Sequence, residues 1–187
     1  MEFSEESKLL IEHWETYQEI VEVADQLEDE ELPAIREEIM ADIEEAEWSN
    51  GWAMRDNNQR KFTMHRPDWM HEEHKVIYIG FSRFRPRRVF GSSGSPTLWV
   101  RVSSDYADLL TLPILDSLRK RDAILGEIND SSRSRDIITK PVQKCPPEAV
   151  DHYAENVKRE VMDFFEHYCT VLSELDELIQ TKLGELE

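Results

Sequence analysis

Cysteine, glycine and long apolar runs are scarce in this chain of 187 residues. Two cysteines, Cys145 and Cys169, are too few for a disulfide framework, so we expect reduced thiols in a reducing compartment. No apolar run approaches the roughly 18 residues that span a bilayer. The amino-terminal residues are acidic where a signal peptide is basic and then apolar. These features predict a soluble, cytoplasmic protein without a membrane partner.

The motifs that depend on glycine are also missing. Gly91–Ser95 has neither the Gly-Lys-Ser/Thr of a phosphate loop nor the Gly-x-Ser-x-Gly of a nucleophile elbow. Cys145 has only Lys144 as a basic neighbour, which does not support a thiolate nucleophile. We therefore expect no catalytic residue and no organic cofactor, and we favour a non-catalytic protein.

Basic residues are few and unevenly placed. The chain has 22 Lys and Arg against 40 Asp and Glu, a net charge of −18. Residues 55–144 hold 17 of the bases and 11 of the acids, whereas the two flanks hold 5 and 29. Arg outnumbers Lys by 14 to 8, and an acidic, lysine-poor surface is typical of proteins from a salt-rich cytosol. The sequence thus predicts a basic centre between acidic flanks, and the net charge opposes non-specific binding of nucleic acid by the whole molecule.

The amino-terminal flank, residues 1–50, has helical periodicity. Apolar residues recur in steps of four and three: Leu10, Trp14, Tyr17, Val21 and Ala24. With Ser4 as the cap, this pattern predicts a long amphipathic helix. We expect the acidic run 28–31 to end that helix and Pro33 to begin a second one. The two helices are predicted to form a helical hairpin.

The carboxy-terminal flank, residues 145–187, has the most regular period. It predicts one amphipathic helix of about 35 residues, roughly 50 Å long at 1.5 Å per residue. Seven apolar positions form its expected interface: Val157, Val161, Phe164, Tyr168, Val171, Leu175 and Leu178. Because the helix is longer than a compact domain of this size requires, we expect the interface to pack on the first helix, on a second copy, or on both. Such an arrangement resembles a coiled coil.

Residues 51–144 between the flanks alternate with a period of two. Predicted strands cover residues 52–54, 61–65, 75–81, 88–90 and 97–102, with an edge strand at 137–142. A helix is expected from Asp105, and residues 129–136 are expected to form a loop. Short connections predict an antiparallel meander of four to five strands, covered by helices. The chain is therefore expected to be a single α+β domain.

An arginine-rich segment follows the predicted strand 75–81. Arg83, Arg85, Arg87 and Arg88 alternate with aromatic residues. Guanidinium groups bind phosphate and aromatic rings stack on bases, so this composition favours nucleic acid. The same arginines also suit an acidic protein partner, or ion pairs with the chain's own acidic helices.

Residues 65–75 are rich in the side chains that bind metals. Asp68, His71, Glu73 and His74 lie within seven residues, and His-x-x-His on one helical turn can ligate zinc. Pro-Asp followed by Glu-x-Lys also resembles the motif of PD-(D/E)xK nucleases, which hold Mg²⁺ with two carboxylates. The resemblance is incomplete, because the carboxylates are too close in sequence and the apolar strand follows Lys75 instead of preceding it. The segment also fits a polar loop that enters a strand.

These patterns lead to three functional hypotheses. We favour a non-catalytic interaction or accessory protein that self-associates, or binds a protein partner, through its helical arm. The first alternative is a factor that binds nucleic acid, or processes it with a divalent metal, through the loop at residues 83–88. The second alternative is an acidic DNA mimic, in which helical carboxylates imitate phosphates.

Overall fold

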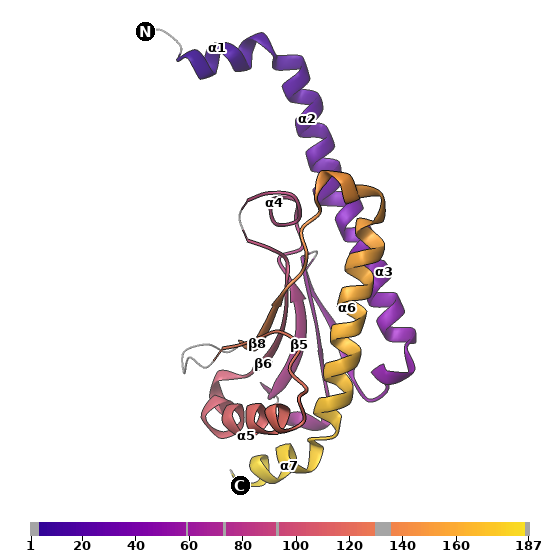
Figure 1. Ribbon diagram of the computed structural model, residues 1–187, viewed down its shortest axis with the longest axis vertical. Helices are drawn as coiled ribbons and strands as arrows, with labels where there is room; N and C mark the ends of the chain where they lie inside the picture. Colours follow the sequence, from indigo (N-terminus) through magenta and orange to yellow (C-terminus); the bar gives the residue numbers. More distant parts are fainter. Residues whose placement is uncertain (1–3, 59, 73, 93, 130–135, 186–187) are drawn as a thin grey trace.

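The computed structural model describes residues 4–58, 60–72, 74–92, 94–129 and 136–185 (Figure 1). Its centre is an antiparallel sheet of six strands in the order β1-β2-β5-β6-β8-β7. The α+β class and the antiparallel sheet are confirmed, with six strands in place of four to five. The strands are β1 (Ala53–Asn58), β2 (Lys61–His65), β5 (Ile77–Ser82), β6 (Thr97–Val102), β7 (Glu127–Ile128) and β8 (Asp136–Pro141). A separate hairpin pairs β3 (Met70–His71) with β4 (His74–Lys75).

Helices make up the rest of the regular structure. They are α1 (Glu5–Glu12), α2 (Trp14–Gln26), α3 (Leu32–Glu45), α4 (Pro86–Val89), α5 (Ala107–Lys120), α6 (Val150–Ser173) and α7 (Asp176–Gly184). A π-helical turn covers Leu27–Glu31, and 3-10 turns cover Glu47–Ser49, Pro67–Trp69, Ser104–Tyr106 and Pro147–Ala149. Among the described residues, no helix has the length and apolar character needed to cross a membrane.

The alternation of side chains gives the sheet an inner and an outer face. Along β5, Ile77, Ile79 and Phe81 are fully buried, while Tyr78 and Ser82, which occupy alternate positions, are only partly buried. Helices α3 and α6 lie on one side of the sheet (Figure 1). Since successive residues of a strand point to opposite faces, the apolar set faces these helices and the polar set faces away. The hydrophobic core therefore lies between the inner face and the helices.

The apolar seam of α6 packs on the inner face of the sheet. Phe165 of α6 and Phe62 of β2 have ring centroids 5.3 Å apart. Of the predicted interface residues, five are buried and two, Val171 and Leu178, are partly buried against the same core. The sheet and α3 of the same chain, rather than the first helix, cover this seam. Aromatic side chains on the inner face of the sheet, such as Phe62, provide the apolar surface on which the seam of α6 packs.

The carboxy-terminal flank is two helices, so the prediction of one helix of about 35 residues is wrong. Helix α6 ends at Ser173, and α7 begins at Asp176. The amide of Leu175 donates to the carbonyl of Leu172 at 3.0 Å, which tightens the last turn. The bend brings α7 beside α5 and buries Ile179 of α7. A straight helix would carry that side chain past the end of the sheet into water.

The acidic run in the amino-terminal flank does not end the helix as predicted. Residues 27–31 form a π-helical turn that joins α2 directly to α3. The amide of Leu32 donates to the carbonyl of Leu27, so the backbone hydrogen bonds continue through the run. Leu32 and Pro33 are buried at the start of α3, and this burial favours the continuation. Ser4 caps α1 as predicted, its hydroxyl accepting from the amide of Ser7 at 3.2 Å.

Three further expectations about the sheet need correction. The predicted strand at residues 88–90 is absent, because Pro86 begins the short helix α4, where its fixed φ fits the first turn. Strand β1 runs to Asn58, four residues beyond the predicted end of this strand at residue 54. Strand β8 is not an edge strand, because β7 pairs outside it. Residues 130–135 of the expected loop lie outside the described residues.

Candidate interaction surfaces

The first two helices form an arm, residues 5–26, that leaves the body of the molecule (Figure 1). Neither α1 nor α2, both described in full, contains a buried residue. The described part of the chain has 13 exposed large apolar side chains, and eight of them belong to the arm. These eight are Leu9, Leu10, Ile11, Trp14, Tyr17, Ile20, Val21 and Val23. The arm thus holds most of the apolar surface that the folded body leaves in water.

The apolar side chains of α2 form a seam along one side of the helix. Trp14, Tyr17 and Val21 follow steps of three and four, and the rings of Trp14 and Tyr17 are 5.6 Å apart. Residues at these spacings share one helix face, whereas Glu15, Glu19 and Glu22 fall toward the other side. The positions next to the seam hold His13, Gln18 and Ile20 and only one acid, Asp25. The seam therefore has flanks with little charge.

The arm bends between its two helices. Helix α1 ends at Glu12 and α2 begins at Trp14, and His13 between them has φ −112° and ψ 30°. A shallow groove of about 330 Å³ lies at this bend. Its apolar lining comes from Leu9, Leu10, Tyr17 and Ile20. The groove continues the seam of α2 onto α1.

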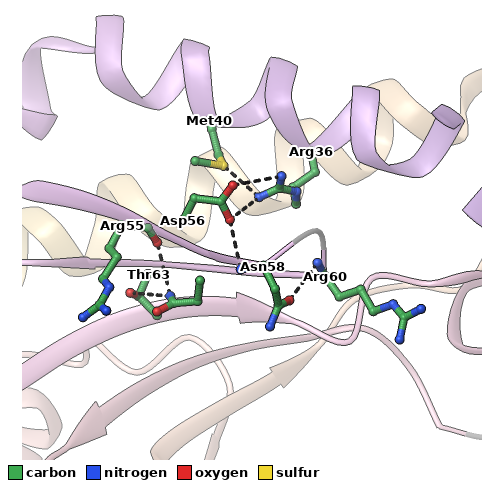
Figure 2. A network of polar contacts seen from close by, with 8 residues as sticks. Arg36, Met40, Arg55, Asp56, Asn58, Arg60 and Thr63 are labelled. Atoms are coloured by element: carbon green, nitrogen blue, oxygen red, sulfur yellow. Dashed lines mark hydrogen bonds and ion pairs between the residues drawn. The ribbon is translucent and has the colours of Figure 1, made fainter. Parts of the chain in front are cut away.

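A buried arginine anchors the base of the arm to the sheet (Figure 2). The side chain of Arg36 in α3 is 3% exposed. Its Nη1 and Nη2 donate to the two carboxylate oxygens of Asp56 in β1, at 2.8 and 3.2 Å. Nη1 also donates to the sulfur of Met40 at 3.2 Å, and the amide of Asn58 donates to Asp56 Oδ1 at 3.2 Å. Sequence reasoning missed this pair, although Arg36 shares the spacing of the buried Ile39 and Ile43.

A second ion pair ties the π-helical turn to the same hairpin. The guanidinium of Arg60, in the β1–β2 connection, is hydrogen bonded to the carboxylate of Glu28. The amide of Arg60 donates to Asn58 Oδ1 at 2.9 Å, as Figure 2 shows. Both partners of the ion pair are partly exposed, so the pair contributes little free energy of folding. It nevertheless links two segments that are far apart in the sequence. The acidic run makes an ion pair with the first hairpin of the sheet.

The four arginines of the segment after β5 do not act as one cluster. Arg83 has a positive φ of 65° and is exposed, and Arg85 precedes α4. Both line a cavity on the outer face of the sheet, whereas Arg87 and Arg88 belong to α4 and do not line it. The pKa of Arg88 is lowered by desolvation and then by the other three arginines. The positive charge of the segment is therefore divided between the cavity, with Arg83 and Arg85, and helix α4, with Arg87 and Arg88.

The proposed metal ligands make other contacts. Asp68 accepts from Arg66 Nη2 at 3.1 Å, and His71 Nδ1 lies 3.0 Å from the hydroxyl of Tyr106. His71 and His74 are partners across the β3–β4 hairpin and not neighbours on one helical turn, the arrangement in which His-x-x-His can ligate zinc. Glu73 lies outside the described residues. Within the described ranges, no three His, Cys, Asp or Glu side chains gather closely enough to hold a metal ion.

Both cysteines are unpaired thiols in the core. Burial raises the pKa of Cys169, and burial followed by the charge of Glu148 raises the pKa of Cys145. The thiolate is the reactive form of cysteine, so both thiols are poorly placed for nucleophilic chemistry. Their position favours a packing role.

Comparison with family models, with curated proteins and with solved structures finds no match to this chain.

Proposed function

We propose that this chain is a non-catalytic interaction protein that self-associates through its amino-terminal arm. The observation that supports the proposal is a 22-residue, two-helix arm with no buried residue and eight exposed large apolar side chains. Helices of 8 and 13 residues are marginal in water without tertiary packing. The arm therefore needs a surface that covers its seam.

A second copy of the same arm fits that surface. Apolar residues in steps of three and four allow identical helices to pack with the side chains of one helix in the holes between side chains of the other. Trp14, Tyr17 and Val21 supply such steps, and the positions beside them hold little charge. The glutamates lie toward the other side, so two paired arms keep most of their like charges apart. Salt screens the repulsion that remains.

The apolar surface is sufficient for a specific contact. Six of the arm's exposed apolar side chains lie on the seam or in the groove: Leu9, Leu10, Trp14, Tyr17, Ile20 and Val21. Burying a half-exposed aliphatic side chain contributes roughly 1 kcal/mol and a half-exposed Trp or Tyr about 2 kcal/mol, so two arms together contribute about 16 kcal/mol. Association costs about 8 kcal/mol in lost translational and rotational freedom, near the middle of the accepted range. The balance of about −8 kcal/mol corresponds to a dissociation constant in the micromolar range.

Sedimentation of the full chain tests this proposal. We expect a dimer to form between 1 and 100 µM, on the order of the estimated affinity, and to be tighter in 1 M than in 0.1 M NaCl because salt screens the acidic faces. The triple variant Trp14→Ala, Tyr17→Ala, Val21→Ala should be monomeric. The matched control Glu15→Ala, Glu19→Ala, Glu22→Ala should still associate, and more tightly at low salt.

Two results would overturn the proposal. The first is a monomeric wild-type chain at the highest concentration in both salts. The second is an equal loss of association in the two triple variants, which would mean that the arm's helicity, rather than its seam, matters. Far-UV circular dichroism of each variant separates loss of association from loss of folding.

A further inference from the structure

The outer face of the sheet holds a cavity of about 650 Å³ with a basic lining, in which cationic side chains outnumber the two acids Glu127 and Asp136. Five cationic side chains line it: Arg60, Lys61, Arg83, Arg85 and Arg101. They come from the β1–β2 connection, from β2 and β6, and from the segment after β5. The strand residues that line it belong to the face that points away from α3 and α6, the acidic helices that Figure 1 shows on the other side of the sheet. The sheet therefore separates this positive charge from the acids of those helices.

Strand register brings these residues together. Lys61 is opposite Ser82, and Ser82 is opposite Thr97, so the three strands form one row at this end of the cavity. Arg101 is four residues further along β6 than Thr97, a distance of about 13 Å at 3.3 Å per residue. That distance is longer than a single phosphate group, so the cavity accommodates a ligand that carries two or more phosphate groups.

A buried tryptophan forms the floor of the cavity. Trp99 lies against Gly80, where a Cβ atom would be 2.1 Å from the indole Cζ2, and its Nε1 donates to the hydroxyl of Ser82 at 3.0 Å. Lys61 Nζ and Arg101 Cζ are 5.3 and 4.5 Å from indole ring centroids, within the range of cation–π contacts. The residue is 2% exposed. Its ring therefore positions two cations and does not offer a stacking face to a base.

Carboxylates neutralise only part of this charge. Arg101 donates to Asp136, and Arg60 pairs with Glu28. Within the part of the chain that the structure describes, Lys61, Arg83 and Arg85 have no ion pair with an acid. The Nε of Arg85 is buried and has no hydrogen-bond partner among the described residues. Burial, and then the charge of Arg101, lowers the pKa of Lys61. A phosphate oxygen beside the Lys61 ammonium would favour its charged form.

We infer that this cavity binds the phosphodiester backbone of a single-stranded nucleic acid, with Lys61, Arg83 and Arg85 as its phosphate ligands. A basic groove that follows the backbone is the usual means of sequence-independent binding to single strands. Here the bases contribute little, because the cavity's indole is covered by its own cations. The inference concerns a different surface from the arm and does not depend on self-association.

Fluorescence anisotropy with a fluorescein-labelled strand of twelve thymidine nucleotides tests the assignment. We expect binding in 50 mM NaCl that weakens as salt rises, with a slope of about −2 for log K against log salt, since three phosphate contacts on a single strand give roughly −0.7 each. The variant Arg83→Ala, Arg85→Ala should bind at least about tenfold more weakly. Lys61→Met, which keeps an unbranched side chain on Trp99, should lose at least about threefold.

The matched control removes the same charge elsewhere. Arg119→Ala, Arg121→Ala changes two exposed arginines at the end of α5 and should stay within about twofold of wild type. No binding in 50 mM NaCl, or an equal loss in this control, overturns the inference. Equal affinity for a duplex of the same length, or equal competition by inorganic triphosphate per phosphate group, also overturns it. If the arginine variant does not fold, the affinity of Lys61→Met for the labelled strand tests the inference instead.

Discussion

Replacing Asp56 by alanine should destabilise the protein more than replacing its partner Arg36 by methionine. The guanidinium of Arg36 is 3% exposed, whereas the carboxylate side chain of Asp56 is 48% exposed. Loss of Asp56 leaves a buried cation with only the sulfur of Met40 as a described hydrogen-bond partner. Loss of Arg36 leaves a carboxylate that water already reaches. Removing Asp56 therefore destabilises the folded protein more than removing Arg36 does.

The magnitude follows from burial. Removing one partner of a fully buried pair costs 3–5 kcal/mol, and the half-exposed position of Asp56 lets water reach the site, so we expect about 2 kcal/mol for Asp56→Ala. Methionine at position 36 fills an apolar space beside Met40 and should cost less than about 1 kcal/mol. In the double variant the buried cation is gone, so its stability should be close to that of Arg36→Met alone.

Urea unfolding followed by far-UV circular dichroism measures these differences. With a denaturant dependence of about 2.5 kcal/mol per molar, Asp56→Ala should lower the midpoint by about 0.8 M. Arg36→Met should lower it by less than half of that amount. The reasoning is refuted if the methionine variant is the less stable one, or if the double variant is as unstable as the sum of the two single variants.

Two further predictions concern the sheet. Gly80→Ala places a Cβ atom 2.1 Å from the ring of Trp99, so the indole must move, and urea unfolding should show a loss of about 2 kcal/mol. Burial, followed by the charge of Lys75, lowers the pKa of His65, so the unfolded chain binds a proton that the folded chain disfavours. Stability should be full above about pH 6.5 and fall as the pH falls below it, and His65→Gln should reduce that fall. An unchanged midpoint for Gly80→Ala, or an identical acid profile for His65→Gln, would contradict the respective prediction.

The parts of the fold that depend on local sequence could be predicted. The strand at residues 97–102 has the expected bounds, because a short run of β-branched and aromatic residues that follows Pro96 defines a strand. The Ser4 cap depends only on its neighbours and is confirmed. The acidic run 28–31 was misread because propensity and dipole arguments apply to an isolated helix. In the folded chain, burial of Leu32 favours the continuation.

The surfaces were harder to predict because they depend on register. Arg83 and Arg85 were recognised by their composition, but Lys61 and Arg101 are far from them in sequence and join them only through the pairing of β2, β5 and β6. The sequence places Trp99 within the predicted strand 97–102, and only the structure shows that its ring also holds two cations. The exposure of the first helix could not be predicted either. The spacing of its apolar residues predicts an apolar helix face, but it does not identify the surface that covers this face.

The continuous backbone from α2 through the π-helical turn into α3 has a mechanical consequence. A flexible hinge at this point would let the arm swing, but a helical turn, the Arg60–Glu28 pair and the Arg36–Asp56 lock restrain its direction. Helix α2 thus extends from the body in a restrained direction for about 20 Å, at 1.5 Å per residue. Two molecules joined by such arms would hold their basic cavities at a set spacing, so one strand of matching length would span both and bind more tightly than two separate strands.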